Sequence, residues 1–377
     1  MKGHSPWMHM ITIGIVLVVI EIASYIAALA MLREGLIVRS PDTSGYEDYL
    51  ANRDPILGWP APASFGQREI DVTGSRIVPA FPDVGASSCV ALFGDSFTWG
   101  EEVSAEESYG NVLSQLLNCR VSNYGVGGYG TDQAVIRYLH VIEDSAPVVV
   151  LGHFSDNIVR NVNQLRDFIA GGRFGFKPRF AYRSGKLELI PLPTLSEQEY
   201  RSVLFNSDQF LPYEFFRPNT KGGAAVMSFP FSRAVVSALF HYRVSAMLRG
   251  IRPTYLEFYR PEHPSNALRV TAELILEAAN VADARNQDMF VLLIPDIHDL
   301  RAVRSGTPAS YAPLAAVLES AGANVIDAAE YLMMAFGSDD FCQLYVRCES
   351  SHFNALGYRL LAESVYRHIN PAVSNFH

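Results

Sequence analysis

The chain has 377 residues, of which 49% are hydrophobic and 18% are charged, and its formal net charge is −9. This length suits one large domain or two ordinary ones, and the composition is that of a globular core with a more apolar part attached. The negative charge argues against nucleic acid as a partner, because there is no basic stripe to neutralise phosphates. It also argues against adhesion to an anionic membrane surface through charge alone.

A long apolar segment, Met10–Leu32, lies near the N-terminus and contains one acid, Glu21. About twenty such residues can cross a bilayer as a helix. Ala28–Ala30 resembles a signal-peptidase site, which would give a soluble secreted product instead. The apolar run continues past Glu21 to the length of a full span, and Lys2 alone supplies the positive charge that a signal peptide carries before its apolar core. We therefore expect an uncleaved membrane anchor over residues 1–33.

Glu21 has two interpretations. Acids inside membranes usually face protein, which would place a partner helix in the membrane near Glu21, but a single acid can also be tolerated close to the midplane. Lys and Arg are nearly balanced on the two sides of the span. The positive-inside rule therefore does not fix the orientation of the chain.

Residues 34–88 are polar and rich in Pro and Gly, with little periodicity. Ile56, Leu57, Trp59 and Phe65 nevertheless favour burial. We expect an irregular linker that packs on the following domain, residues 89–377.

Beyond residue 88, short apolar strands alternate with amphipathic helices. Strands are predicted near 89–94, 119–124, 147–152, 289–294 and 324–327, and helices near 105–118, 131–144, 266–285, 309–321 and from Asn354 onward. This alternation predicts an α/β fold in which a parallel sheet is covered by helices on both faces.

Residues at about 160–265 interrupt the alternation. Arg179–Ile190 is predicted to be a hairpin that turns at Ser184-Gly185, and Phe229–Leu248 is predicted to be an amphipathic helix. Because this insertion follows the third strand, we expect it to shape the substrate cleft. The alternatives are a decorative subdomain or a surface that docks a partner.

The turn after the first strand contains Gly94-Asp95-Ser96. Gly94 permits a sharp turn. Ser96 then lies at the carboxyl end of a strand, where open α/β sheets place their chemistry. Asp95 is expected to bond the local backbone.

Three later segments extend this pattern: Val121–Gln133 and Val148–Asn157 each follow a strand, and Glu349-Ser-Ser-His352 precedes the last helix. Together with Gly94-Asp95-Ser96 they resemble the four sequence blocks of the SGNH/GDSL hydrolases. The resemblance covers about residues 88–160 and 288–370. It implies a flavodoxin-like three-layer α/β/α fold with a five-stranded parallel sheet.

The resemblance also implies a catalytic triad. A serine hydroxyl needs a base within hydrogen-bond reach, and that base must be oriented by a third group. Ser96 is the candidate nucleophile, His352 the base and Glu349 the acid. The family usually has aspartate where this chain has Glu349, and the alternative role of Glu349 is to satisfy the dipole of the last helix.

An oxyanion hole is implied as well, made by the backbone N–H groups of Ser96 and Gly128 and the side-chain amide of Asn157. The family's third block usually ends Asn-Asp, whereas this chain has Asp156-Asn157. Either Asn157 serves or Asp156 occupies the position, and we expect Asn157.

No cofactor or metal is predicted. The glycines at 125, 127, 128 and 130 do not have the spacing of a dinucleotide-binding loop. Asp296, His298 and Asp299 lie on one segment without a further ligand, so we expect them to solvate a loop.

The expected function is a serine esterase that removes O-acyl groups, most simply acetyl, from a cell-envelope or extracellular glycan. A glycan O-acetyltransferase with the same triad and a non-catalytic glycan-binding or scaffold protein are the alternatives.

The four cysteines fall into two pairs, Cys89 with Cys119 at the starts of neighbouring strands and Cys342 with Cys348 before Glu349. We expect the Cys342–Cys348 disulfide, of the kind formed in an oxidising compartment, whereas the pairing of Cys89 with Cys119 stays open. The alternative is that the first two are buried apolar thiols and the other two are incidental. Paired cysteines would place the domain outside the cytoplasm, in a periplasmic location.

Overall fold

The computed structural model describes residues 6–40, 45–62, 69–169, 175–218, 220–349 and 351–374. The chain divides into two compact units. Unit 1 consists of Met1–Ala51, Asn163–Phe176 and Pro193–Thr254, and unit 2 of Asn52–Val162, Lys177–Leu192 and Tyr255–His377. Most of the expected insertion thus belongs to unit 1, together with the N-terminal segment. Phe65 of the expected linker lies outside the described residues.

Unit 2 is built on a five-stranded, fully parallel sheet with the order β3-β2-β4-β8-β9. The first strand of the sheet in the sequence therefore lies between the second and the third, which is the flavodoxin-like order expected above. Strands β2 and β4 are buried almost throughout, because both faces of the sheet are covered. The strands are β2 Val90–Phe93, β3 Val121–Asn123, β4 Val148–Phe154, β8 Asp288–Ile294 and β9 Asn324–Asp327.

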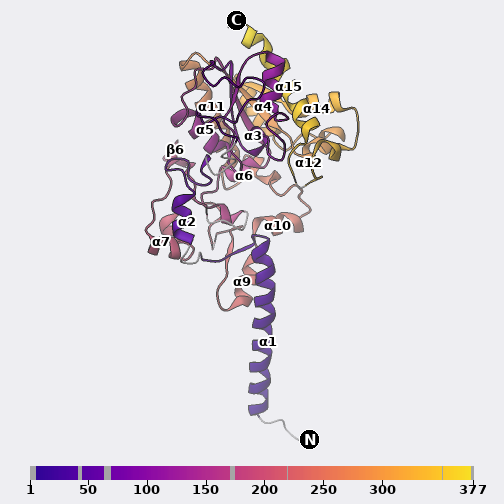
Figure 1. The fold of residues 1–377 in the computed structure, drawn as a ribbon. Coiled ribbons are helices and arrows are strands. Elements are labelled where there is room, and N and C mark those ends of the chain that lie inside the picture. Colours follow the sequence, from indigo (N-terminus) through magenta and orange to yellow (C-terminus); the bar gives the residue numbers. More distant parts are fainter. Residues whose placement is uncertain are drawn as a thin grey trace. The chain divides into compact units, whose positions relative to one another are not determined.

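Helices cover the two faces of this sheet, which makes the three-layer α/β/α arrangement (Figure 1). One layer contains α5 Thr131–His140, α11 Ala267–Ala284 and α13 Ala312–Ser320. The other contains α4 Tyr109–Leu117, α14 Ala328–Phe336 and α15 Ala355–Ser374. The α/β fold class is confirmed.

The shorter elements of unit 2 lie mostly at the strand ends. They are α3 Ser96–Trp99, α6 Asn157–Arg160, α12 Ile297–Arg304, the 3₁₀ turns Leu256–Tyr259 and Phe341–Leu344, and the antiparallel hairpin of β5 Arg179–Arg183 with β6 Lys186–Ile190. The predicted hairpin is confirmed. Helix α4 begins at Tyr109, four residues later than predicted, because Ser108 is its N-cap.

The segment expected to be a solvated loop at Asp296–Asp299 instead begins α12. Asp296 accepts the backbone N–H of Asp299 at 2.9 Å, and Asp299 accepts that of Asp296 at 3.1 Å. This reciprocal arrangement is a capping box made by two aspartates.

Unit 1 contains a two-stranded parallel sheet of β1 Ile37–Val38 and β7 Ala225–Val226. Its helices are α1 Pro6–Arg33, α2 Gly45–Ala51, α7 Glu197–Ser202, α8 Ser207–Phe210, α9 Phe231–Ala238 and α10 Tyr242–Leu248, with a 3₁₀ turn at Arg166–Phe168. The single helix predicted over Phe229–Leu248 is therefore two helices, separated by residues 239–241.

Helix α1 is long and apolar enough to cross a membrane over Trp7–Arg33, and only 6% of its most apolar window is buried. Glu21 in this helix does face protein. Its carboxylate accepts the backbone N–H groups of Phe231 and Ser232 at the start of α9. The helix that contacts Glu21 thus belongs to the same chain.

Both pairs of cysteines form disulfides, the expected pair Cys342–Cys348 and also the pair Cys89–Cys119 that the sequence left open. Cys89 and Cys119 have Cα atoms 6.1 Å apart at the starts of paired strands, and Cys342 and Cys348 have Cα atoms 4.7 Å apart before the final helix. The structure thus holds all four cysteines in bonds within one unit.

Thiol counting tests this pairing. Protein that is denatured in the presence of an alkylating agent should take up no alkyl group, and the same protein after reduction should take up four, as measured by intact mass. Uptake of two groups without reduction would show that one of the pairs does not form.

Candidate active site

Ser96 begins α3, directly after the end of β2. A Cβ atom added at Gly94 would lie 2.0 Å from Oγ1 of Thr98, so only glycine fits the start of this turn. Asp95 accepts the backbone N–H of Phe97 at 2.9 Å, and burial raises the pKa of the Asp95 carboxyl. The Ser96 side chain is consequently fixed at the carboxyl end of the sheet, with 5% of the residue exposed.

His352, which is near the C-terminal end of the sequence, lies beside this serine. Its Nε2 atom lies 2.8 Å from Oγ of Ser96. Its ring packs against Phe97, with the ring centroids 4.9 Å apart. The predicted nucleophile and base therefore lie within hydrogen-bond reach of each other.

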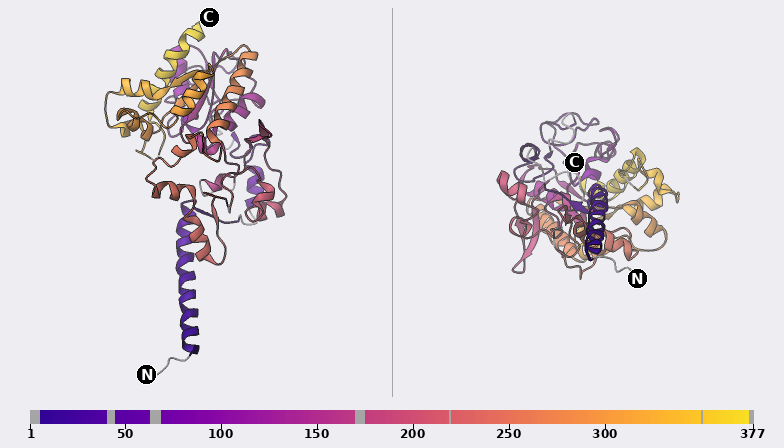
Figure 2. Two further views of the ribbon diagram at one scale, coloured as in Figure 1. Left: turned by 180° about the vertical axis from the view of Figure 1, so that it is seen from behind. Right: turned by 90° about the horizontal axis from the view of Figure 1, so that it is seen from below.

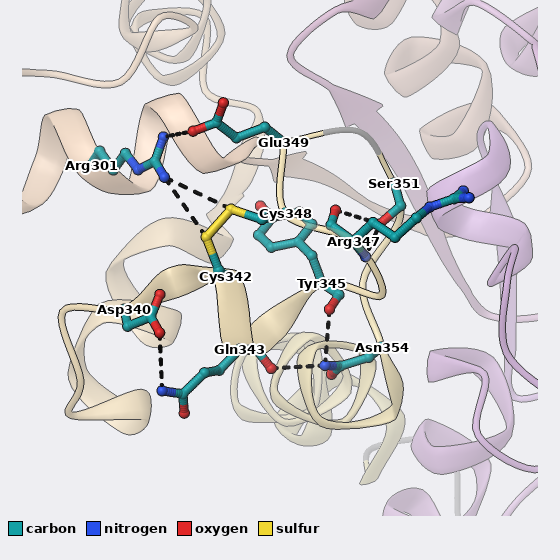
Figure 3. Close-up of a disulfide and its surroundings, with 10 residues drawn as sticks. All are labelled: Arg301, Asp340, Cys342, Gln343, Tyr345, Arg347, Cys348, Glu349, Ser351 and Asn354. Atoms are coloured by element: carbon teal, nitrogen blue, oxygen red, sulfur yellow. Dashed lines mark hydrogen bonds and ion pairs between the residues drawn. A yellow bond between two sulfur atoms is a disulfide. The ribbon is translucent and has the colours of Figure 1, made fainter.

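The acid beside His352 is Glu102, and the expectation for Glu349 is corrected. Oε2 of Glu102 lies 3.0 Å from Nδ1 of His352 and accepts the His352 backbone N–H at 2.8 Å. Glu349 instead pairs with Arg301, as Figure 3 shows. The physical reason is that the guanidinium of Arg301 binds the Glu349 carboxylate, while Glu102 occupies the hydrogen-bonding position at Nδ1 of His352.

Glu102 is held in an unusual conformation for a non-glycine residue, with a φ of 69°. Although partial burial acts to raise its pKa, hydrogen bonds from His352 and the charges of His352 and Arg347 bring the pKa of the Glu102 carboxyl below its usual range. Arg347 does not compete with the imidazole, because it binds the other carboxylate oxygen, Oε1, at 2.6 Å. The carboxylate is therefore ionised, and Oε2 is left to His352.

A second acid is close to the same imidazole. Oε2 of Glu101 lies 3.6 Å from Nε2 of His352, on the side of the ring that faces Ser96. This distance is beyond a hydrogen bond. Glu102 is thus the acid placed to orient the ring, and Glu101 is a neighbouring charge.

The loop that carries His352 is closed at several points (Figure 3). The Cys342–Cys348 disulfide joins its first half, and Tyr345 and Phe353 form an antiparallel bridge across its ends. The Asn354 side chain donates to the carbonyl of Gln343 at 2.7 Å. These contacts fix the position from which His352 reaches the serine.

The predicted oxyanion groups follow the neighbouring strands β3 and β4, whose carboxyl ends flank that of β2. Gly128 has a φ of 82°, and a Cβ atom there would lie 3.7 Å from the ring of Trp59. The Asn157 amide is fully buried, and its oxygen and nitrogen make no hydrogen bond, although the amide lies close enough to Asp95 to lower the pKa of that carboxyl.

Asp156 differs from Asn157. Its carboxylate is 41% exposed and pairs with Arg160 at 3.3 Å. A buried amide without a partner is costly unless a ligand atom completes it, whereas the Asp156 carboxylate already has solvent and Arg160 as partners. Of the two side chains, Asn157 is the one with unused hydrogen-bonding capacity.

A buried polar chain supports the end of β4. The Tyr259 hydroxyl donates to the Ser155 carbonyl at 2.8 Å and lies 2.8 Å from Nε2 of His153. Since that hydroxyl has a single proton, His153 must donate from Nε2, and its Nδ1 accepts from Thr131 at 2.7 Å. Burial lowers the pKa of His153 to about 3, which keeps it neutral.

Asp299 and Asp296 lie next to this chain. Asp299 accepts the Ser155 hydroxyl and the backbone N–H of Ser310. Burial and the charge of Asp299 raise the pKa of Asp296 to about 7, while the Tyr255 hydroxyl bonds it at 2.6 Å. Within the described residues no group of His, Cys, Asp and Glu side chains could hold a metal ion.

The sequence interpretation missed Glu102. It lies six residues after Ser96, in a stretch with two consecutive acids, and no spacing rule distinguishes one from the other. The signal that could have drawn attention to it is its place directly after a glycine-terminated turn.

No family model matches the chain, and no curated protein matches its sequence. Solved structures with a similar arrangement include a member of the lipolytic protein G-D-S-L family from Veillonella parvula, with 14% identity, 74% of this chain and 96% of that chain covered, and a TM-score of 0.34. A catalytic mutant of an acetylxylan esterase from Geobacillus stearothermophilus has 12% identity, with 76% and 95% covered and a TM-score of 0.38. An alpha/beta hydrolase from the metagenome of Lake Arreo has 12% identity, with 76% and 97% covered and a TM-score of 0.39. The similarity is one of structure, and the chemistry proposed for this chain rests on its own site.

Proposed function

We propose that the chain is a serine ester hydrolase of the SGNH/GDSL kind with the triad Ser96, His352 and Glu102. The observation that supports this proposal is the continuous hydrogen-bonded path from Oγ of Ser96 to Nε2 of His352, at 2.8 Å, and from Nδ1 to Glu102, at 3.0 Å. This arrangement supplies a nucleophile, a base and an orienting acid in sequence.

In the proposed reaction, the ionised Glu102 holds the neutral imidazole with its proton on Nδ1, so that Nε2 accepts the Ser96 proton. Oγ then attacks the acyl carbonyl, and the developing oxyanion is met by the N–H groups of Ser96 and Gly128 and the Asn157 amide. Collapse of the intermediate returns the proton from Nε2 to the departing alcohol. A water molecule, activated in the same way, releases the acid from Ser96.

The proposed substrate is a small O-acyl group, most simply acetyl, on a cell-envelope or extracellular glycan. Two features support this choice. Ser96 is only 5% exposed, which favours a short acyl group. The half-buried Trp59 ring lies beside Gly128, and indole rings offer an apolar face against which a sugar ring can pack.

The proposed location is a membrane surface outside the cytoplasm, in a periplasmic setting, with α1 as an uncleaved anchor. The support is the length and apolar character of α1 and the two disulfides, since disulfides persist in oxidising compartments. Transfer of the acyl group to a sugar hydroxyl in place of water would make the same site an acetyltransferase.

Ser96→Ala tests the nucleophile. It should lower hydrolysis of a small acetyl ester by on the order of a thousandfold and abolish labelling by a fluorophosphonate, because it removes only the attacking hydroxyl. Folding is checked by the unfolding midpoint, which should be unchanged. Labelling of this variant at the same rate as the parent, or an unlabelled parent, would contradict the proposal and favour a non-catalytic role. Product analysis with an acetylated glycan and a free glycan separates release of acetate from transfer.

Glu102→Gln should reduce turnover at least about tenfold with little change in KM, because the uncharged amide no longer stabilises the imidazolium. Glu349→Gln and Glu101→Gln are the matched controls, and both should have smaller effects. Glu102→Gly should lose turnover as well, because glycine has no carboxylate to orient the imidazole. A larger loss at Glu349 than at Glu102 would restore Glu349 as the acid.

Asn157→Ala and Asp156→Ala distinguish the two candidates for the third oxyanion donor. Asn157→Ala should lower kcat/KM by a factor that corresponds to about 3 kcal/mol of activation free energy, because it removes a donor aimed at the developing charge. Asp156→Ala should cost much less, since it removes a half-exposed carboxylate from Arg160, which keeps Asp95 as a second partner at 3.5 Å. The opposite order, measured with the same ester, would show that Asp156 occupies the functional position.

A further inference from the structure

The position of Glu21 fixes the depth of α9 relative to any membrane that α1 crosses. The apolar helix Trp7–Arg33 has 27 residues. A span needs about twenty residues, and every stretch of that length within Trp7–Arg33 contains Glu21. Glu21 therefore lies within the membrane wherever the helix is centred, and so does whatever contacts its carboxylate.

Glu21 and the start of α9 satisfy each other's polar groups. The carboxylate accepts the backbone N–H groups of Phe231, at 2.6 Å, and Ser232, at 3.4 Å, and also the Ser232 hydroxyl. The next N–H, of Arg233, bonds the Pro230 carbonyl at 3.1 Å. The first three N–H groups of α9 thus have partners, which lowers the cost of beginning a helix inside a membrane.

The two helices approach closely through small side chains. Ala28 of α1 and Ala234 and Ala238 of α9 are buried in one cluster with Ile37 and Ala225. Alanine at such contacts is typical of helix packing within membranes. Figures 1 and 2 show α9 beside the part of α1 nearest its C-terminus.

The opposite side of the segment exposes large apolar side chains. Phe229 is 75% exposed and Phe240 is 71% exposed, and Val236 and Leu239 between them are also exposed. On α1, large apolar residues between Trp7 and Leu29 are exposed in the same manner, whereas Ala28 is buried against α9. The two exposed surfaces meet at a row of aromatic rings, in which Tyr25 of α1 contacts Phe231 and Phe231 contacts Phe229.

We infer that Met227–Phe240 is a second membrane-inserted element, in which the chain enters one leaflet at Met227–Pro230 and returns as α9. This inference rests on the proposed anchoring by α1, and it is independent of the proposed chemistry. Lipid acyl chains, rather than another protein, cover this exposed surface. The reason is that it adjoins the surface of α1, whose length and apolar composition suit a bilayer.

The charged groups of the segment limit the depth of insertion. Arg233, which is exposed, is the one charged residue of α9. A long arginine side chain can reach the headgroups from within one leaflet, but not from beyond the midplane. Arg243, Arg249 and Arg252 follow within twelve residues of Phe240, where they would meet anionic headgroups.

Lipid quenching in vesicles tests the inference with the full chain. A polarity-sensitive fluorophore is attached to single introduced cysteines, since the four native cysteines are paired. Phe229→Cys and Phe240→Cys are the test positions, Ile13→Cys on α1 is the lipid-facing reference and Phe205→Cys, 64% exposed in unit 1, is the water-facing reference. In vesicles of phosphatidylcholine and phosphatidylglycerol, spin-labelled acyl chains should quench the probes at 229 and 240 several-fold more than the probe at 205.

Three results would overturn the inference. Quenching at 13 but not at 229 or 240 would place the segment outside the bilayer. Protection of 229 and 240 from a water-soluble quencher without lipid quenching would identify a protein contact. Absence of lipid quenching at 13 as well would show that α1 is not in the bilayer, and would leave the esterase proposal intact.

Glu21→Leu provides a second measurement. It removes the acceptor for the first N–H groups of α9, so lipid quenching of the probe at 229 should fall several-fold while that at 13 is unchanged. Glu21→Gln, which keeps one acceptor oxygen, should have the smaller effect. Equal quenching at 229 in all three proteins would show that Glu21 does not hold the segment in place.

Discussion

The site depends on one imidazole that bridges two groups of the same tight turn. Ser96 begins the four-residue helix α3, and Glu102 lies three residues beyond the end of that helix. The N–H groups of Gly100 and Glu101 fix this end by donating to the Ser96 carbonyl, each at 3.0 Å. The distance between nucleophile and acid is thus set by local backbone geometry. His352 comes from a distant part of the sequence, and its contacts with both Ser96 and Glu102 fix its position.

This arrangement has a cost that the rest of unit 2 offsets. Glu102 has a left-handed backbone, and Asp95 is buried beside the nucleophile with Arg160 at 3.5 Å. Strained backbone and buried charge are tolerated where the surrounding structure determines them strongly. Here the surroundings are the buried strands β2 and β4, the closed loop before α15 and the polar chain through His153 and Tyr259. The strain is concentrated where the proposed chemistry needs a fixed carboxylate.

Unit 1 contains a comparable arrangement, in which two unfavourable polar groups satisfy each other. An acid in an apolar helix and the open N-terminus of another helix are each unfavourable in a membrane, and Glu21 and α9 remove both problems at once. In each unit a carboxylate accepts a backbone N–H from a distant part of the chain: Glu102 from His352, and Glu21 from Phe231. Long-range contacts of this type join segments that are separated by 250 and 210 residues.

The sequence by itself determined the repeating features. The alternation of apolar strands and amphipathic helices predicted the parallel sheet, the turn at Gly94-Asp95-Ser96 placed the serine at a strand end, and the apolar run predicted α1. The cysteine pairs followed from the positions of two strand starts and one short loop. These predictions succeed because periodicity and turn residues act locally, within a few residues of the chain.

Only the tertiary structure decided which acid meets His352 and what Glu21 contacts. The three-residue spacing of Glu349 and His352 favoured a carboxylate that pairs with Arg301 in the folded chain and does not contact His352. Glu102 reaches the imidazole from 250 residues away, and Glu21 reaches α9 from 210. Such contacts leave no local pattern in the sequence, because their geometry is created only when the sheet and the helices have packed.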